Sequence, residues 1–192
     1  MLGPLLFAGL RFMGNNLILK DTPRYECLAE MGKLFPDMDP SSSYAFLHLI
    51  KTTDDVWRVM HEHLANHNIT QGRFLVLMLL MEKPDVDYRC PSTPAEIAEM
   101  ASVSRATVTG LLDSLERDGF ISRSPDPSDR RVTTIAITDS GRAFMAKILP
   151  PHFRILAHLM KPLNDDERTV LVTILTKISA HIEENREEIR SL

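Results

Sequence analysis

The sequence of 192 residues contains only two cysteines, Cys27 and Cys90, and they lie far apart. Two such residues predict no disulfide framework, and a reducing cytoplasm is the simpler expectation. No apolar run approaches the roughly 18 residues that indicate a membrane-spanning helix. The apolar start lacks the basic leader and the cleavage site of a signal peptide. We therefore expect a cytoplasmic protein.

The chain also lacks an excess of positive charge. Its net charge is −4, and the stretch from Thr93 to Arg142 contains six arginines, no lysine and eight acidic residues. This balance gives no general attraction to nucleic acid. If the chain binds DNA, its cations must be individually placed rather than abundant.

Motifs of catalysis and metal binding are missing as well. The sequence has no Gly-rich phosphate loop, no set of four metal ligands and no nucleophile elbow. His63 and His67 have the i, i+4 spacing of a zinc pair, and His61 is close by, but no cysteine or acidic pattern completes a site. We predict a solvated helix end there, no metal, no cofactor and no enzymatic activity.

Two short helices are predicted in the middle of the chain. Thr93 and Glu96 have the T-x-x-E spacing of a capping box, and Pro94 stands at the first helical position. This helix should run to about Met100. After a three-residue turn, Ser104 should cap a second helix that ends near Asp118 and Gly119. Two short helices joined by such a turn form a helix-turn-helix.

The second of these helices is amphipathic. One face has i, i+3, i+4, i+7 apolar spacing, made by Val108, Leu111, Leu112 and Leu115. The other faces carry Arg105, Ala106, Thr107, Thr109, Gly110 and Asp113. Small residues allow close approach to DNA, and hydroxyls and an arginine can hydrogen-bond to it. The alternative is that they are ordinary capping and surface residues.

A β-hairpin is predicted next, with strands at 121–124 and 132–137. Two prolines stiffen the loop between them, and Arg130 and Arg131 stand near its tip. Such a loop is a wing that can place a guanidinium against phosphates or in a narrow minor groove.

The stretch SRATVTGLLDSLERDGFISR resembles the recognition helix and first wing strand of the MarR family of bacterial transcription regulators. PDPSDRR resembles the wing of that family, and TDSGR its entry into the next helix. Ser114 stands where arginine is common in the family, which implies that a backbone or phosphate contact is absent there. The resemblance implies an intertwined homodimer built from both termini.

The resemblance also implies a set of residues that bind DNA. Arg131 is the better candidate for the minor groove, and Arg130 for a phosphate contact or a pair with Asp129. The predicted DNA-binding set is Ser104, Arg105, Ala106, Thr107, Thr109, Gly110, Arg123, Asp129, Arg130 and Arg131.

Long helices should flank this core. The first should run from about Tyr44 to Asn66, capped by Ser42 or Ser43 after a linker, PDMDPSSS. The helix that Thr138 caps should be interrupted and bent at Pro150 and Pro151. The predicted fold is mainly α with a β-hairpin wing. Its expected parts are an N-terminal extension at 1–40, a dimerisation region at 41–69 and 143–192, and the winged helix-turn-helix at 70–142.

Family pockets lie between the dimer helices and the winged helix and often admit aromatic acids. The corresponding residues here are Trp57, Met60, His61, Arg73, Phe74, Met78 and Phe153. An arginine there could pair with a carboxylate effector, although each residue is also explicable as core. Family members that sense urate have a Trp-Asp pair where Arg73 and Phe74 stand, which argues against urate.

We therefore predict a homodimeric, ligand-responsive repressor that binds a palindromic operator in double-stranded DNA. The alternatives are an effectorless architectural or protein-interaction winged helix, and a regulator that senses redox state through Cys27 or Cys90.

Overall fold

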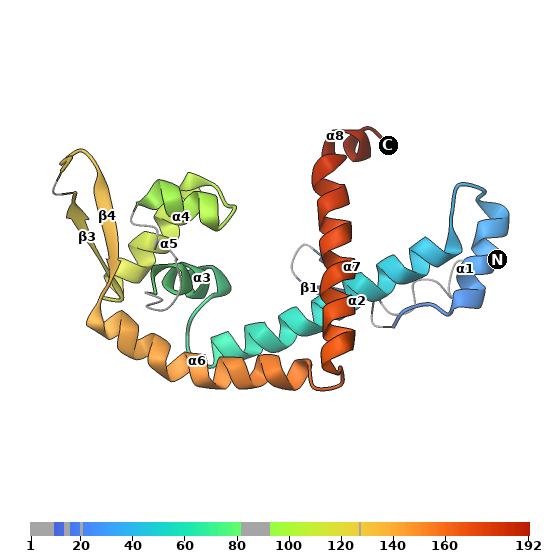
Figure 1. The fold of residues 1–192 in the computed structure, drawn as a ribbon, viewed down its shortest axis with the longest axis horizontal. Helices are drawn as coiled ribbons and strands as arrows, with labels where there is room; N and C mark the ends of the chain where they lie inside the picture. Colours follow the sequence, from blue (N-terminus) through green and yellow to red (C-terminus); the bar gives the residue numbers. More distant parts are fainter. Residues whose placement is uncertain (1–9, 14–15, 20, 82–92, 127) are drawn as a thin grey trace. The chain divides into compact units, whose positions relative to one another are not determined.

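A computed structural model describes residues 10–13, 16–19, 21–81, 93–126 and 128–192, with side chains from Asp21 onward. Helices predominate, and two short antiparallel hairpins accompany them (Figure 1). The chain divides into two compact units, Met1–Met78 and Leu79–Leu192. The predicted mainly helical fold with a β-hairpin wing is confirmed. The functional ranges predicted for extension, dimerisation and DNA binding stay predictions.

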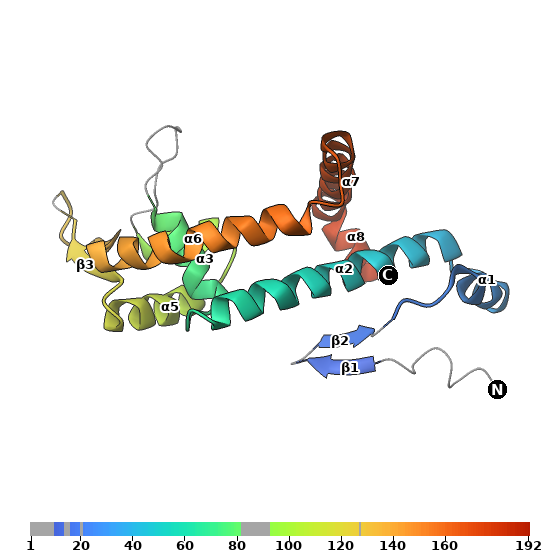
Figure 2. The ribbon, with the colours of Figure 1, turned by 90° about the horizontal axis from the view of Figure 1, so that it is seen from below.

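The first unit contains a hairpin and two helices that pack together. Strands β1 (Leu10–Met13) and β2 (Asn16–Leu19) pair antiparallel, and helix α1 (Tyr25–Leu34) packs against α2 (Pro40–Ala65). Figure 2 shows the hairpin beside α2. Helix α3 (Gln71–Leu80) begins in this unit and continues into the second.

Helix α2 begins earlier than the sequence predicted, at Pro40 rather than Tyr44. The Asp39 carboxylate accepts hydrogen bonds from the backbone N–H groups of Ser41 and Ser42 at 3.0 and 3.1 Å. Pro40 occupies the first helical position, where a missing N–H costs nothing. The expected serine cap is therefore wrong, and the aspartate before the proline is the cap.

The second unit holds the helix-turn-helix and the elements after it. Helices α4 (Pro94–Met100) and α5 (Arg105–Arg117) precede strands β3 (Ile121–Pro125) and β4 (Thr133–Ile137). Three helices follow: α6 (Asp139–Leu159), α7 (Asp165–Glu184) and α8 (Arg186–Ser191). The core of this unit is formed by Ile97, Val108, Leu112, Leu115, Ile121, Ile135, Met145 and Ile148.

Helix α6 runs without interruption through Pro150 and Pro151, contrary to the expected break. A proline removes one N–H donor, but its fixed φ near −65° is itself a helical value. The chain therefore keeps helical dihedrals through the pair, while buried Met145 and Ile148 hold the preceding turns in the core.

The start of α6 packs closely against the junction between α5 and β3. Gly119 ends α5 with a φ of 75°, and the Phe120 carbonyl accepts a hydrogen bond from the Thr138 N–H at 3.0 Å. The rings of Phe120 and Phe144 stack with centroids 4.4 Å apart. A Cβ added to Gly141 would lie 2.2 Å from the Phe120 carbonyl oxygen. Only glycine fits this approach.

Helix α7 exposes apolar side chains along its length. Its start is a capping box, in which Asn164 and Glu167 each accept the other's backbone N–H at 2.8–2.9 Å. No residue of the helix is buried, and its large apolar side chains are exposed: Val170, Val172, Ile174, Leu175, Ile178 and Ile182. Among the described residues, no helix combines the length and apolarity needed to cross a bilayer.

Two glycines in the second unit give opposite expectations for substitution by alanine. Gly141→Ala should destabilise the fold by about 1–3 kcal/mol or more, because the new methyl meets the Phe120 backbone. Gly110→Ala should stabilise it by up to about 1 kcal/mol, since a Cβ there meets nothing within 4 Å. Urea unfolding of both variants checks this. Equal effects would contradict the close packing at Gly141.

Candidate nucleic-acid interface

The helix-turn-helix is built from two capped helices and a tight turn. The Thr93 hydroxyl accepts the Glu96 N–H at 3.2 Å, and the Glu96 carboxylate accepts the Thr93 N–H at 3.0 Å, which confirms the predicted capping box. Ser102 adopts a left-handed φ of 52° in the turn. The Ser104 hydroxyl then accepts the Thr107 N–H at 3.1 Å and begins α5 as expected.

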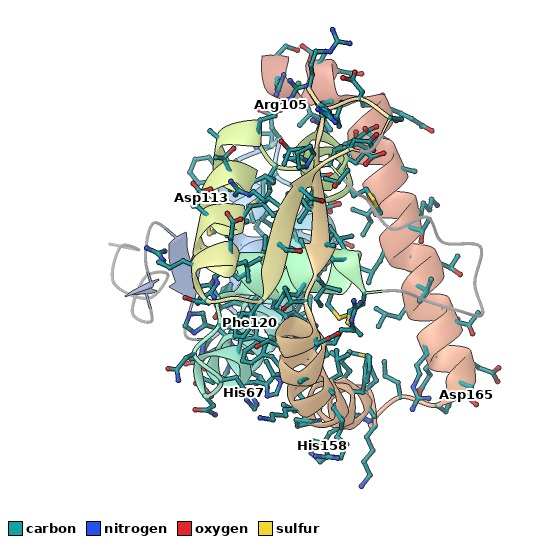
Figure 3. All side chains as sticks on the ribbon, turned by 90° about the vertical axis from the view of Figure 1, so that its left-hand side faces the viewer. His67, Arg105, Asp113, Phe120, His158 and Asp165 are labelled. Atoms are coloured by element: carbon teal, nitrogen blue, oxygen red, sulfur yellow. The ribbon has the colours of Figure 1, made fainter. Side chains whose placement is uncertain are left out.

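Helix α5 presents a clearly divided surface. Of the four residues that the spacing predicted for the apolar face, Val108, Leu112 and Leu115 are buried and Leu111 is half-buried. The exposed predicted DNA contacts on the helix are Arg105, Ala106, Thr107, Thr109 and Gly110. Figure 3 shows Arg105 near one end of the helix and Asp113 further along it.

The hydroxyl groups of this helix are already engaged within the chain. The Thr109 hydroxyl donates to the Arg105 carbonyl at 2.9 Å, and the hydroxyls of Ser104 and Thr107 lie 2.8 Å apart. Each retains lone pairs that can accept a hydrogen bond. On the helix surface that faces outward, Arg105 therefore supplies the strongest donor among the predicted contacts.

Hydrogen bonds from Asp126 shape the wing loop. Strands β3 and β4 pair antiparallel up to Pro125 and Thr133. The Asp126 carboxylate then accepts the N–H groups of Ser128 and Asp129 at 2.7 and 3.1 Å. The Ser128 hydroxyl, followed by these N–H groups, lowers the pKa of Asp126. Sequence reasoning missed this role, although an aspartate two residues before a serine is a turn signal.

Asp129 holds Arg131 at the tip of the wing. Arg131 Nε and Nη2 donate to the two carboxylate oxygens of Asp129, both at 3.0 Å, and the Arg131 N–H donates at 3.0 Å. The guanidinium lowers the pKa of Asp129, and the carboxylate raises that of Arg131. The Arg131 side chain remains 90% exposed. It is thus oriented but accessible.

The pairing of Asp129 with Arg130 that sequence reasoning allowed is wrong, because the carboxylate is occupied by Arg131. Because Arg131 stands two residues after Asp129, its backbone N–H and its guanidinium can both donate to the same carboxylate. Arg130 is exposed and has no hydrogen bond or ion pair with any other residue in the described part of the chain. A phosphate contact by Arg130 stays a prediction.

Arg123 is placed differently from the other predicted contacts. Its Nη2 lies 2.6 Å from Asp113 Oδ1, and its Nε lies 3.3 Å from Glu116 Oε2. Its side chain is 29% exposed. Asp113 and Glu116 belong to α5, so this arginine links β3 to the recognition helix. Sequence reasoning did not anticipate the link, which spans ten residues across the turn at Gly119.

The predicted effector residues are divided between the two units, since six lie in Met1–Met78 and Phe153 lies in the other. Met60 and Phe74 are buried, whereas Trp57 and Phe153 are 49% and 53% exposed. His61 is exposed, and Arg73 and Met78 are partly buried. No single unit contains the whole set, and the pocket stays a prediction.

The candidate metal-binding histidines and the two cysteines are the remaining residues that the sequence singled out. His63 is buried, and its ring lies 5.2 Å from that of His67, centroid to centroid, whereas His61 is exposed. The expected solvated helix end is therefore wrong for His63 and correct for His61. The described residues contain no cluster of three potential metal ligands. Cys27 is exposed and free, and Cys90 lies outside the described residues.

Comparison with known proteins identifies the family. A protein-family model described as MarR family matches residues 69–133 of the chain. The HTH-type transcriptional repressor YetL of Bacillus subtilis is 34% identical over 157 residues, 82% of this chain and 92% of that protein. The regulator PecS of Dickeya dadantii is 24% identical, over 79% of this chain and 89% of its own. The chain therefore belongs to the MarR family of transcription regulators, which are DNA-binding regulators and not enzymes.

Solved structures agree with this assignment. Wild-type MarR from E. coli in its apo form has a TM-score of 0.54 and 27% identity, over 70% of this chain and 93% of that one. A mutant MarR from E. coli complexed with operator DNA has a TM-score of 0.58 and 25% identity, over 77% of this chain and 96% of that one.

The carboxylate that orients Arg131 can be tested directly. Asp129→Asn should release the guanidinium, because it replaces the negative charge and turns one of the two acceptor oxygens into an NH2 donor. In the wild type the lowered pKa of Asp129 means that the pairing is complete above the usual carboxyl pKa and is lost as the pH falls through the lower folded value. The NMR signal of Arg131 Nε–H, followed against pH, measures both effects. Asp126→Asn is the control, and an Arg131 signal unchanged in Asp129→Asn would contradict the pairing.

Proposed function

We propose that the chain is a homodimeric, cytoplasmic repressor that binds a palindromic operator in double-stranded DNA. The observation that carries the proposal is an exposed recognition-helix surface beside a wing whose arginine is oriented by Asp129. Similarity to a named repressor, and to a MarR structure solved with operator DNA, supports the same conclusion.

Helix α5 enters the major groove. A recognition helix in a helix-turn-helix reads base edges with its N-terminal residues. In this chain those residues include Arg105, whose guanidinium is suited to guanine, and Ala106, which is small enough to meet a thymine methyl group. Ser104 combines its role as cap with a contact to phosphate, and Thr107, Thr109 and Gly110 complete the surface.

The wing reaches the neighbouring minor groove. Arg131 is nearly fully exposed, and its pairing with Asp129 limits the conformations that must be lost on binding. A narrow minor groove has an enhanced negative potential that attracts such an arginine. Arg130, next to it, contacts phosphate.

The dimer forms through the helices at the two ends of the chain. Along α7, Val170, Ile174 and Ile178 repeat at intervals of four residues and are 40–56% exposed. Phe46 and Ile50 on α2 are also exposed. Apolar surfaces of this kind mark association, and two-fold symmetry supplies the same surface twice.

A small aromatic or carboxylate effector modulates the binding of DNA. The support is chemical: Trp57 exposes a large aromatic surface, and Arg73 carries the kind of charge that pairs with a carboxylate. A ligand that binds better to one spacing of the two recognition helices than to another changes operator affinity by that difference.

Footprinting of the purified protein on DNA upstream of its own gene tests the proposal. We expect protection of two half-sites related by two-fold symmetry, about 34 Å apart along the helix axis. Titration with aromatic carboxylic acids should shorten the protected region or abolish it. Equal affinity for this DNA and for a scrambled duplex would contradict sequence-specific regulation.

Arg131→Ala should weaken operator binding and make log affinity fall less steeply with log salt, because one cation is removed from the DNA interface. The reason is that Arg131 is the exposed, oriented cation of the wing. Fluorescence anisotropy with labelled operator at several salt concentrations measures both. Arg131→Lys is the matched control, which keeps the charge but loses the two-pronged fork. Unchanged affinity of the alanine variant at moderate salt would contradict this role.

Removal of residues 165–192 should yield a monomer or an aggregate, with operator affinity reduced to the non-specific level. The reason is that α7 exposes its apolar residues on the single chain. Sedimentation velocity measures the state of association. Ile174→Glu is a milder variant with the same expectation, and Lys177→Glu on the same helix is its control. A soluble truncated dimer that still bound the operator tightly would contradict the proposed interface.

A further inference from the structure

Arg123 is set apart from the other cations of the interface by its two acidic neighbours. Its Nη2 donates a hydrogen bond to Asp113 at 2.6 Å, and its Nε lies 3.3 Å from a Glu116 oxygen as an ion pair without a hydrogen bond. The two carboxylates are 57% and 43% exposed, whereas Arg123 is 29% exposed. The arginine thus lies on the inner side of a small charged cluster, and the acids lie on its outer side.

The position of Asp113 makes this cluster important for DNA binding. Asp113 follows Gly110 by three residues and Ala106 by seven, so it lies on the same outer face of α5. Figure 3 shows Asp113 on this helix, beside the β3–β4 hairpin. A carboxylate on a face that meets DNA is repelled by phosphates, and over these few ångströms salt screens the repulsion only in part.

We propose that Arg123 is a positioning residue that neutralises Asp113 and Glu116 and braces the wing against the recognition helix, and that it does not itself bind phosphate. The proposal rests on the proposed DNA-binding function and changes the role that the sequence predicted for Arg123. Its guanidinium forms ion pairs with two carboxylates of α5, one of which also accepts a hydrogen bond, so a move towards phosphate would leave both acids unneutralised beside DNA.

The brace also joins the two DNA-reading elements mechanically. Asp113 and Glu116 are on α5, and Arg123 is on β3, the strand that leads into the wing loop. Arginine suits this position because its broad guanidinium donates a hydrogen bond to Asp113 through Nη2 while Nε lies beside Glu116, an arrangement that the single ammonium group of lysine does not reproduce. The pairing therefore fixes the distance between the major-groove and minor-groove contacts.

A double-mutant cycle on operator binding distinguishes the two roles. In the wild-type background Arg123→Gln, which keeps the aliphatic stem, should lower affinity on the order of tenfold at low salt. In the background Asp113→Asn with Glu116→Gln, the same substitution should change affinity by less than about twofold, because no acid remains to be neutralised. The salt slope in that background should also be unchanged.

Arg117→Gln is the matched control. Arg117 is exposed on the same helix, and no ion pair joins it to another of the described residues. Arg117→Gln should have the same effect in both backgrounds, because it removes one positive charge that is not paired with Asp113 or Glu116. Arg123→Lys should fall between the wild type and Arg123→Gln, whereas a plain phosphate contact would leave the lysine variant near the wild type.

Two outcomes would overturn the proposal. One is an equal loss from Arg123→Gln in both backgrounds with a salt slope reduced by about one, which is the signature of a direct phosphate contact. The other is the absence of coupling between the same substitutions in urea unfolding, a measurement that needs no DNA. The unfolding cycle measures the coupling of Arg123 to the two acids without DNA. If the wild type binds no operator, the proposed function is refuted, while the unfolding cycle still tests the positioning role of Arg123.

Discussion

The approach of Gly141 to the Phe120 carbonyl is the contact on which the DNA-reading unit depends. It brings the first turn of α6 against the point where α5 gives way to β3. Hydrogen bonds from Thr138 to the carbonyls of Gly119 and Phe120 hold the same point. Since β4 ends at Ile137, one junction fixes the end of the recognition helix, both wing strands and the start of the long helix that follows.

That junction allows short elements to hold precise positions. A hairpin of two five-residue strands is marginally stable alone. Here Ile121, Ile135 and Ile137 are buried against the helical core, and Arg123 ties the strand to α5. The wing loop is then ordered by two aspartates rather than by apolar contacts. The conformation of the loop is therefore sensitive to charge, whereas its base combines the Arg123 ion pairs with an apolar core.

Sequence patterns predicted the parts of this fold that rest on local chemistry. The Thr93 capping box, the Ser104 cap and the buried face of α5 are read from residues within one or two turns of each other. The errors arose where two local signals competed, as when Asp39 rather than a serine capped α2, or where an expected break was tolerated, as at Pro150. The link from Arg123 to Asp113 crosses a chain reversal, and the pocket residues are spread over two units. No local pattern specifies either arrangement.

The lack of excess positive charge explains why the ion pairs of Arg123 and Arg131 matter. A strongly basic protein can bind DNA through its overall field, but a chain of net charge −4 cannot. Each cation that takes part in binding must be held in position, and each acidic residue near it must be paired within the protein. Asp129 orients Arg131, and Asp126 orders the loop. Asp129 and Asp126 thus support the conformation of the wing loop and of the arginine that it carries.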